Sequence, residues 1–157
     1  MMSINNQKLK ICLAASAGGH LTQLLKLSGC WNDNEVFCVS TLKSAVKKIQ
    51  KFGRYYIIGE CNREHPWQVL KVLKNCLGII LKEKPDVIIS TGAGPACLLC
   101  IVGKLLRAKI IWIDRIANVE RLSLSGRIIR PFANLILTQW PEVAKQYKSV
   151  YYAGNLL

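Results

Sequence analysis

Acidic residues are scarce in this sequence. Its 157 residues include nine Asp and Glu against 22 Lys and Arg, which gives a formal net charge of +13. A surface with this excess attracts phosphate groups, so nucleic acid, anionic lipid and phosphorylated substrates are the partners to consider. Part of the excess falls on one side of a short predicted helix, at Lys43, Lys47, Lys48 and Lys51, where a solvated helix face is an equally ordinary interpretation.

Long apolar runs are also missing, although 51% of the residues are hydrophobic. The longest candidate, Pro95–Leu106, is interrupted by Lys104 and is shorter than the roughly 20 residues that a membrane-spanning helix needs. The amino-terminal stretch MMSINNQKLK has no apolar core, so no signal peptide is expected. We therefore expect a cytosolic chain without a transmembrane helix.

The common signatures of metal and cofactor sites are absent as well. The seven cysteines are an odd number and fall mostly in apolar segments, as expected for small core residues in a reducing compartment. Cys97 and Cys100 have CxxC spacing, but no second pair accompanies them, so we interpret them as core residues. No glycine run fits the dinucleotide-binding GxGxxG or the P-loop pattern, and no HxxxH, DxD or Cys-His cluster occurs. We predict no bound metal and no cofactor.

Short apolar segments rich in Ile, Val and Leu alternate with helical patterns along the chain. The predicted strands are Leu9–Ala15, Val36–Ser40, Tyr55–Ile58, Val87–Ser90, Ile110–Ile113, Leu135–Thr138 and Val150–Tyr152. The predicted helices are Leu21–Leu27, Leu42–Phe52, Pro66–Lys84, Pro95–Arg107 and Glu142–Tyr147. This alternation predicts an α/β fold with a doubly wound, Rossmann-like parallel sheet. With no linker or repeat in view, we expect one domain over residues 1–157.

Two glycine-rich loops, Ser16–His20 (SAGGH) and Thr91–Pro95 (TGAGP), each connect a predicted strand to a helix. With the strand order 3-2-1-4-5, both fall where the order reverses, which is where α/β sheets bind ligands. Gly18 and Gly19 allow the backbone to approach a ligand closely, and an open helix N-terminus attracts an anion. A plain strand-to-helix turn would need the same glycines.

His20 is one of only two histidines in the chain. At a helix N-terminus a neutral imidazole has a lowered pKa and can act as a base, although it could equally do no more than hydrogen-bond the turn. The second histidine, His65, precedes Pro66 and is interpreted as a helix cap.

The segment Trp112–Trp140, WIDRIANVERLSLSGRIIRPFANLILTQW, has the most distinctive order of features in the chain. Its core is LSLSGR (Leu122–Arg127), followed by an apolar strand and TQWP (Thr138–Pro141), and VYYAGN (Val150–Asn155) closes the pattern. This order resembles the membrane-side subunit of the split N-acetylglucosaminyltransferase of dolichol-linked oligosaccharide synthesis, and its bacterial capsule and exopolysaccharide homologues. The resemblance implies the amino-terminal half of a two-domain GT-B glycosyltransferase.

The resemblance also implies roles for individual residues. A base near the crevice, His20 or Asp114, would deprotonate the acceptor hydroxyl, unless Asp114 instead pairs structurally with Arg115. The acceptor's sugar and diphosphate would contact Ser16, Gly18, Gly19, Gly92, Gly94, Pro95, Asn118, Arg121 and Arg127.

Two surfaces for partners follow in the same way. The arginines Arg121, Arg127 and Arg130, with the apolar Leu122, Leu124, Ile128, Ile129 and Phe132 around them, suit contact with anionic lipid headgroups. The carboxyl-terminal residues implied to dock a catalytic subunit are Tyr151, Tyr152, Leu156 and Leu157.

The implied protein is half of an enzyme, a peripheral subunit at the cytoplasmic face of the membrane. It would hold a polyprenyl-diphosphate-linked sugar and recruit a small catalytic glycosyltransferase subunit that binds a UDP-sugar. Two other functions remain to be weighed. A basic nucleic-acid-binding α/β domain explains the charge but not the two glycine loops. A self-sufficient nucleotide-dependent enzyme lacks its cofactor fingerprint. We expect no nucleic-acid partner.

Overall fold

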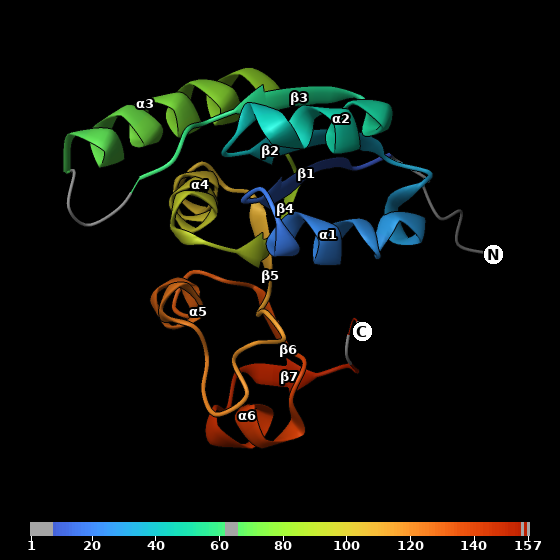
Figure 1. The fold of residues 1–157 in the computed structure, drawn as a ribbon, viewed down its shortest axis with the longest axis vertical. Helices are drawn as coiled ribbons and strands as arrows, with labels where there is room; N and C mark the ends of the chain where they lie inside the picture. The colour runs from blue at the N-terminus through green and yellow to red at the C-terminus, as the bar shows by residue number, and fades with distance from the viewer. Residues whose placement is uncertain (1–7, 62–65, 155, 157) are drawn as a thin grey trace.

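The computed structural model describes residues 8–61, 66–154 and 156. In these residues seven strands form one sheet with the order β3-β2-β1-β4-β5-β6-β7, and every neighbouring pair is parallel (Figure 1). The strands are β1 (Lys10–Ala15), β2 (Glu35–Ser40), β3 (Arg54–Ile57), β4 (Val87–Gly92), β5 (Lys109–Ile113), β6 (Leu135–Thr138) and β7 (Val150–Tyr152). The predicted doubly wound parallel sheet and its order through the fifth strand are therefore confirmed.

Helices alternate with these strands, close to the predicted positions. They are α1 (Gly19–Leu25), α3 (Pro66–Glu83), α4 (Gly94–Leu105), α5 (Leu124–Ile129) and α6 (Pro141–Gln146), with a 3-10 turn η1 (Ser28–Trp31) after α1. Residues 43–52 are helical, as predicted, but they are not one continuous α-helix. They form η2 (Lys43–Ala45), α2 (Val46–Ile49) and η3 (Gln50–Phe52). Ala45 and Ile49, four residues apart, reach the core there, so one α-helical turn packs on the sheet between two tighter 3-10 turns.

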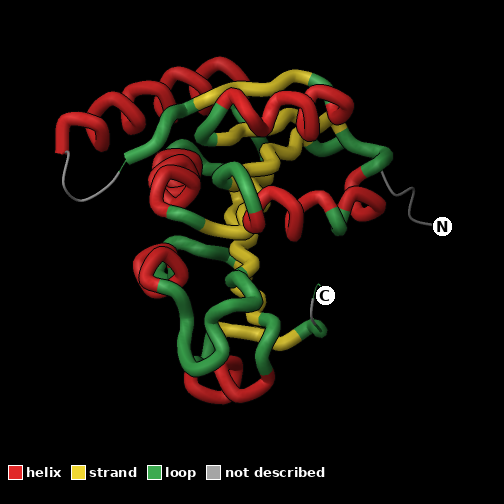
Figure 2. Tube along the Cα trace, in the orientation of Figure 1, coloured by secondary structure: helices red, strands yellow, loops and turns green. Residues whose placement is uncertain are grey.

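Two clusters of apolar side chains cover the two faces of the sheet. The first includes Cys76 of α3, Leu99 of α4 and Ile129 of α5, and the second includes Leu24 of α1 and Ile49 of α2. Figure 2 shows these helices on either side of the strands. Five of the seven cysteines are buried, as expected for small core residues, namely Cys12, Cys38, Cys76, Cys97 and Cys100.

The half of the sheet formed by β5, β6 and β7 is covered differently. Ile136 and Val150 point into the first cluster, beneath the helices. Side chains alternate along a strand, so Leu137 and its registered neighbour Tyr151 point to the opposite face. Within the described residues, no residue of these three strands joins the second cluster, and Figure 1 shows no helix labelled over that face of β6 and β7. One face of this half-sheet therefore lacks a helical layer.

No helix in the described parts of the chain is both long and apolar enough to cross a bilayer. The longest helix, α3, has 18 residues, and lysines interrupt its apolar side chains.

Candidate functional site

The two glycine-rich loops lie side by side at the carboxyl edge of the sheet, because β1 and β4 are neighbouring parallel strands. Nδ1 of His20 lies 2.8 Å from the carbonyl oxygen of Thr91. In return, the Thr91 hydroxyl donates to the carbonyl oxygen of His20 across 2.7 Å. These two hydrogen bonds join the start of α1 to the end of β4, at the point where the strand order reverses.

The bond to Thr91 also decides which ring nitrogen of His20 is free. A carbonyl oxygen only accepts, so Nδ1 carries the proton and Nε2 keeps its lone pair. Burial lowers the pKa of His20 below its usual value, and the nearby Arg115 lowers it further, against the opposing effects of the Thr91 bond and the Asp114 charge. A neutral imidazole of this kind can accept a proton from a hydroxyl group near neutral pH.

The second glycine loop has a backbone that few residues tolerate. Gly92 adopts a φ of +121°, and a Cβ there would lie 3.0 Å from Cε1 and Nδ1 of the His20 ring. The next residue, Ala93, adopts φ 81° and ψ 158°, a conformation that costs a residue with a side chain about 1–3 kcal/mol. Ala93 is the N-cap of α4 and offers no side-chain cap. The amides of Gly94 and Ala96 therefore have no partner within the helix, and Pro95 between them has no amide hydrogen. Strain of this kind is typical of functional sites.

A cavity of about 580 Å³ opens beside the two loops, within the size range of small-molecule sites. Three of the predicted site residues line it, Ser16 from the first loop and Gly94 and Pro95 from the start of α4. Gly18, Gly19 and Gly92 shape the loops without lining the cavity. The helix α1, which begins at Gly19, is only seven residues long. The sequence interpretation missed Glu60 and Gln68, which also line it. Their signal was their position after β3, whose carboxyl end lies at the same edge.

Asp114, directly after β5, is buried in a separate cluster of hydrogen bonds. Its Oδ1 accepts from the Trp112 indole N–H at 3.2 Å and from the Ser123 hydroxyl. Its Oδ2 accepts from the Ser123 amide at 2.8 Å and from the Asn118 side chain at 3.3 Å. In the described residues it forms no ion pair with Arg115, the structural partner considered from the sequence. With both oxygens occupied, this carboxylate anchors the loop over residues 115–123.

Residues of the TQWP motif fasten the same loop from the other side. The Gln139 side chain donates to the Asp114 carbonyl at 3.0 Å, and the Trp140 indole donates to the Ile116 carbonyl at 2.6 Å. Trp112 connects this cluster to the crevice, because its ring lies 3.7 Å from the Cβ position of Gly92. The loop is thus continuous with the His20 site through packed side chains.

The remaining predicted residues lie apart from the crevice. Asn118 and Arg121 line a depression of about 330 Å³ in the 115–123 loop, and Arg127 is exposed on α5. The expected lipid contact was wrong for Leu122 and Ile129, which are buried in the first apolar cluster. Exposed apolar residues on α5 are limited to Leu124 and Ile128.

The predicted docking residues lie at the free edge of the sheet. Tyr151 and Tyr152 are exposed on β7. Leu156 is half-buried, with its amide donating to the Gln139 side chain at 2.8 Å, whereas Leu157 lies outside the described residues, as does His65.

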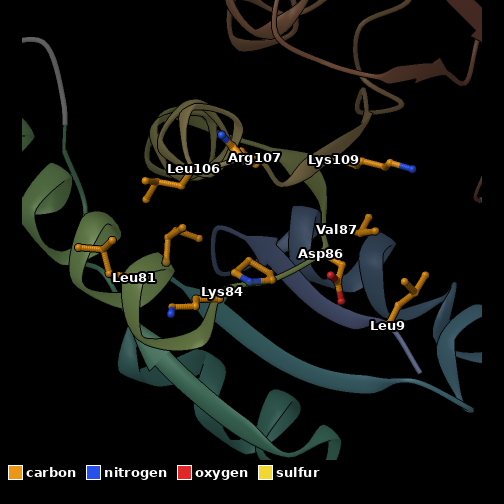
Figure 3. Close-up of a pocket in the computed structure, with 10 residues that line it drawn as sticks. Leu9, Leu81, Lys84, Asp86, Val87, Leu106, Arg107 and Lys109 are labelled. Atoms are coloured by element: carbon orange, nitrogen blue, oxygen red, sulfur yellow. The ribbon is translucent and has the colours of Figure 1, made fainter. Parts of the chain in front are cut away.

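Another cavity, of about 640 Å³, lies at the opposite edge of the sheet, where the strands begin (Figure 3). Its cationic side chains include Lys84 and Arg107, which follow the carboxyl-terminal ends of α3 and α4. The negative end of a helix dipole repels an anion, so these cations complement the helix ends rather than forming an anion site. This cavity also lacks the glycine loops, and the candidate site remains the crevice at the carboxyl edge.

Comparison with known sequences gives a match over nearly the whole chain. Residues 11–156 match the family described as "Oligosaccharide biosynthesis protein Alg14 like". The "UDP-N-acetylglucosamine transferase subunit alg14" of Schizosaccharomyces pombe is 28% identical over 165 residues, covering 88% of this chain and 79% of that protein. The human "UDP-N-acetylglucosamine transferase subunit ALG14" is 25% identical over 182 residues, covering 96% of this chain and 84% of that protein.

Solved structures share the fold at low sequence identity. MurG from Acinetobacter baumannii superposes with a TM-score of 0.77 and 14% identity, covering 94% of this chain and 46% of that one. The UDP-N-acetylglucosamine 2-epimerase from Rickettsia bellii gives 0.73 and 16%, covering 96% of this chain and 46% of that one. This chain thus spans about half the length of these structures. The predicted equivalence to half of a two-domain GT-B fold is confirmed.

Proposed function

Because this chain belongs to the family of Alg14-like oligosaccharide biosynthesis proteins, we propose that it is the acceptor-side subunit of a two-part glycosyltransferase. Residues 1–157 act as one domain that holds a polyprenyl-diphosphate-linked sugar. A small catalytic subunit binds the UDP-sugar, with UDP-N-acetylglucosamine the donor suggested by the names of the relatives. The observation that carries this proposal is the family match over residues 11–156, on a fold that equals half of a GT-B structure.

His20, which lies beside the cavity and not among its lining residues, is the proposed base. Its Nε2 takes the proton from the acceptor hydroxyl as that oxygen attacks the anomeric carbon of the donor sugar, whose bond to the phosphate breaks so that UDP leaves with the catalytic subunit. Thr91 holds Nδ1 and fixes the ring. The open amides at the start of α4, a helix of 12 residues, receive the acceptor's diphosphate together with Ser16. Asp114 positions the 115–123 loop and does not move a proton, since its oxygens already accept four hydrogen bonds.

The catalytic subunit docks on the uncovered face of β5, β6 and β7. Leu135 and Leu137 are half-buried there, and Tyr151 is 56% exposed. Exposed apolar surface of this kind marks a partner site in a stable protein. Tyr152 on β7 and Leu156, which is bonded to Gln139, lie next to this face and belong to the docking surface.

The membrane lies against the outer face of α3. Trp67, Leu70, Leu77 and Leu81 recur at helical spacing and are exposed, with Lys71, Lys74 and Lys82 near them. Tryptophan and lysine beside exposed leucines are typical of peripheral binding to anionic lipid at an interface. We infer that the subunit contacts the cytoplasmic surface of the membrane through this face of α3.

The two alternatives receive no comparable support. Helices cover both faces of the sheet at β1, β2 and β4 in the described residues. This part of the sheet therefore offers no exposed surface on which bases would stack. No known nucleic-acid-binding or cofactor-dependent family appears among the relatives described above.

The test is a transfer assay with UDP-N-acetylglucosamine and polyprenyl-diphosphate-linked N-acetylglucosamine. The chain is assayed alone and with the small protein that co-purifies with it from native cells. We expect turnover only with both, and loss of complex formation when Leu137→Asp and Tyr151→Ser are combined. Leu9→Ser is the matched control, because Leu9 is also an exposed leucine but immediately precedes β1, away from β6 and β7. Turnover by the chain alone would falsify the two-part enzyme.

A further inference from the structure

The crevice carries two polar side chains that face its phosphate-attracting end. Glu60 follows β3, and Gln68 lies in the first turns of α3. Both line the 580 Å³ cavity together with the start of α4, and both also line an adjoining depression of about 360 Å³ along α3. These two side chains are thus shared by both hollows.

Glu60 is held toward the first glycine loop by a relay through Thr41. The buried Thr41 hydroxyl lies 3.5 Å from Oε1 of Glu60 and 3.3 Å from the Ala17 amide, from which it accepts. The chain therefore directs a carboxylate at the cavity in which the neighbouring helix N-terminus attracts anions. A phosphate beside Glu60 would be repelled by the carboxylate. The phosphate therefore binds at the start of α4.

The chemistry of this pair suits a polyhydroxylated ring. A carboxylate accepts two or more hydroxyl hydrogen bonds, and a carboxamide both donates and accepts, so Glu60 and Gln68 together match adjacent sugar hydroxyls. The neighbouring thiol of Cys61 takes no part as a nucleophile, because burial and then the Glu60 charge raise its pKa.

We propose that the Glu60–Gln68 side of the crevice is a subsite for an uncharged sugar ring, and that Glu60 makes it reject sugars bearing a carboxylate. This inference rests on the proposed acceptor-binding function and adds the class of sugar. The phosphate of the acceptor lies at the start of α4, and its proximal sugar lies against Glu60 and Gln68. Uronic acids place a second negative charge beside Glu60 and bind poorly.

Titrations of the full chain with soluble probes test this subsite. The probes are N-acetylglucosamine 1-phosphate, glucuronic acid 1-phosphate and inorganic pyrophosphate, followed by nuclear magnetic resonance. We expect the native chain to prefer the neutral sugar phosphate by about tenfold, or ~1.4 kcal/mol. In Glu60→Gln the preference falls below about threefold, chiefly because the uronic acid gains affinity. Glu142→Gln, an exposed carboxylate on α6, keeps the native preference.

The outcomes separate this inference from the function on which it rests. If pyrophosphate and both sugar phosphates bind but Glu60→Gln keeps the native preference, the Glu60 subsite is overturned and acceptor binding stands. The same holds if the sugar phosphates bind no better than pyrophosphate. If no probe binds, the proposed acceptor site itself is overturned. A circular dichroism spectrum and melting curve matching those of the native chain show that Glu60→Gln is folded.

Discussion

His20 and Thr91 exchange hydrogen bonds across the edge of the sheet, ring nitrogen to carbonyl in one direction and hydroxyl to carbonyl in the other. The exchange couples two loops that are 71 residues apart in sequence. It fixes the orientation of the imidazole before any ligand arrives, which is what a base must have if proton transfer is to occur without reorganisation. The close approach of the two loops depends on Gly92, whose Cα faces the ring.

Gly92→Ala should therefore destabilise the fold and displace the imidazole. The new Cβ meets the His20 ring at 3.0 Å, in a backbone conformation that alanine adopts only with strain. We expect a loss of about 1–3 kcal/mol in the free energy of unfolding, measured in urea. Gly94→Ala is the control, since its Cβ would have no neighbour within 4 Å. Equal stabilities of the two variants would contradict the packing of His20 on Gly92.

His20 also gives stability a predictable pH dependence. Its folded-state pKa is lowered, mainly by burial, from an unfolded value of about 6.5. Below that value the unfolded chain gains a proton that the folded chain resists, so the stability contributed by neutral His20 is complete above it and declines as the pH falls. Unfolding curves at several pH values should show a steeper acid decline for the native chain than for His20→Asn. Parallel declines would indicate an exposed imidazole.

The sequence predicts the sheet well because its signal is local. Each buried strand is a short run of Ile, Val and Leu, and Gly18 and Gly92 mark the loops where the chain turns. The site is harder to predict, since its partners come from distant segments. The position of Glu60 after β3 indicates the edge of the sheet but not that it lines one cavity with the start of α4. An acid at the end of β5 suggests a base as readily as an anchor.

Asp114→Asn separates those two roles. The asparagine places an N–H₂ group among four donors, so at least one hydrogen bond becomes a repulsive contact in a buried site. We expect a loss of about 2–4 kcal/mol in the free energy of unfolding and faster hydrogen exchange in residues 115–123. Glu120→Gln, exposed in the same loop, should change stability little. Native stability combined with lost transfer activity would instead identify Asp114 as the base.

The exposed leucines on the outer face of α3 are expected to contact the membrane. Replacing Leu70 and Leu77 by serine removes two exposed apolar side chains that would enter the lipid interface. We expect binding to anionic vesicles to weaken by at least about tenfold with an unchanged melting temperature, as measured by sedimentation. Leu42→Ser is the control, because Leu42 is 43% exposed, like Leu77 at 44%, but precedes η2, which packs on the other face of the sheet. If the control loses binding and the α3 variant keeps it, the lysine-rich η2–α2 surface contacts the membrane instead.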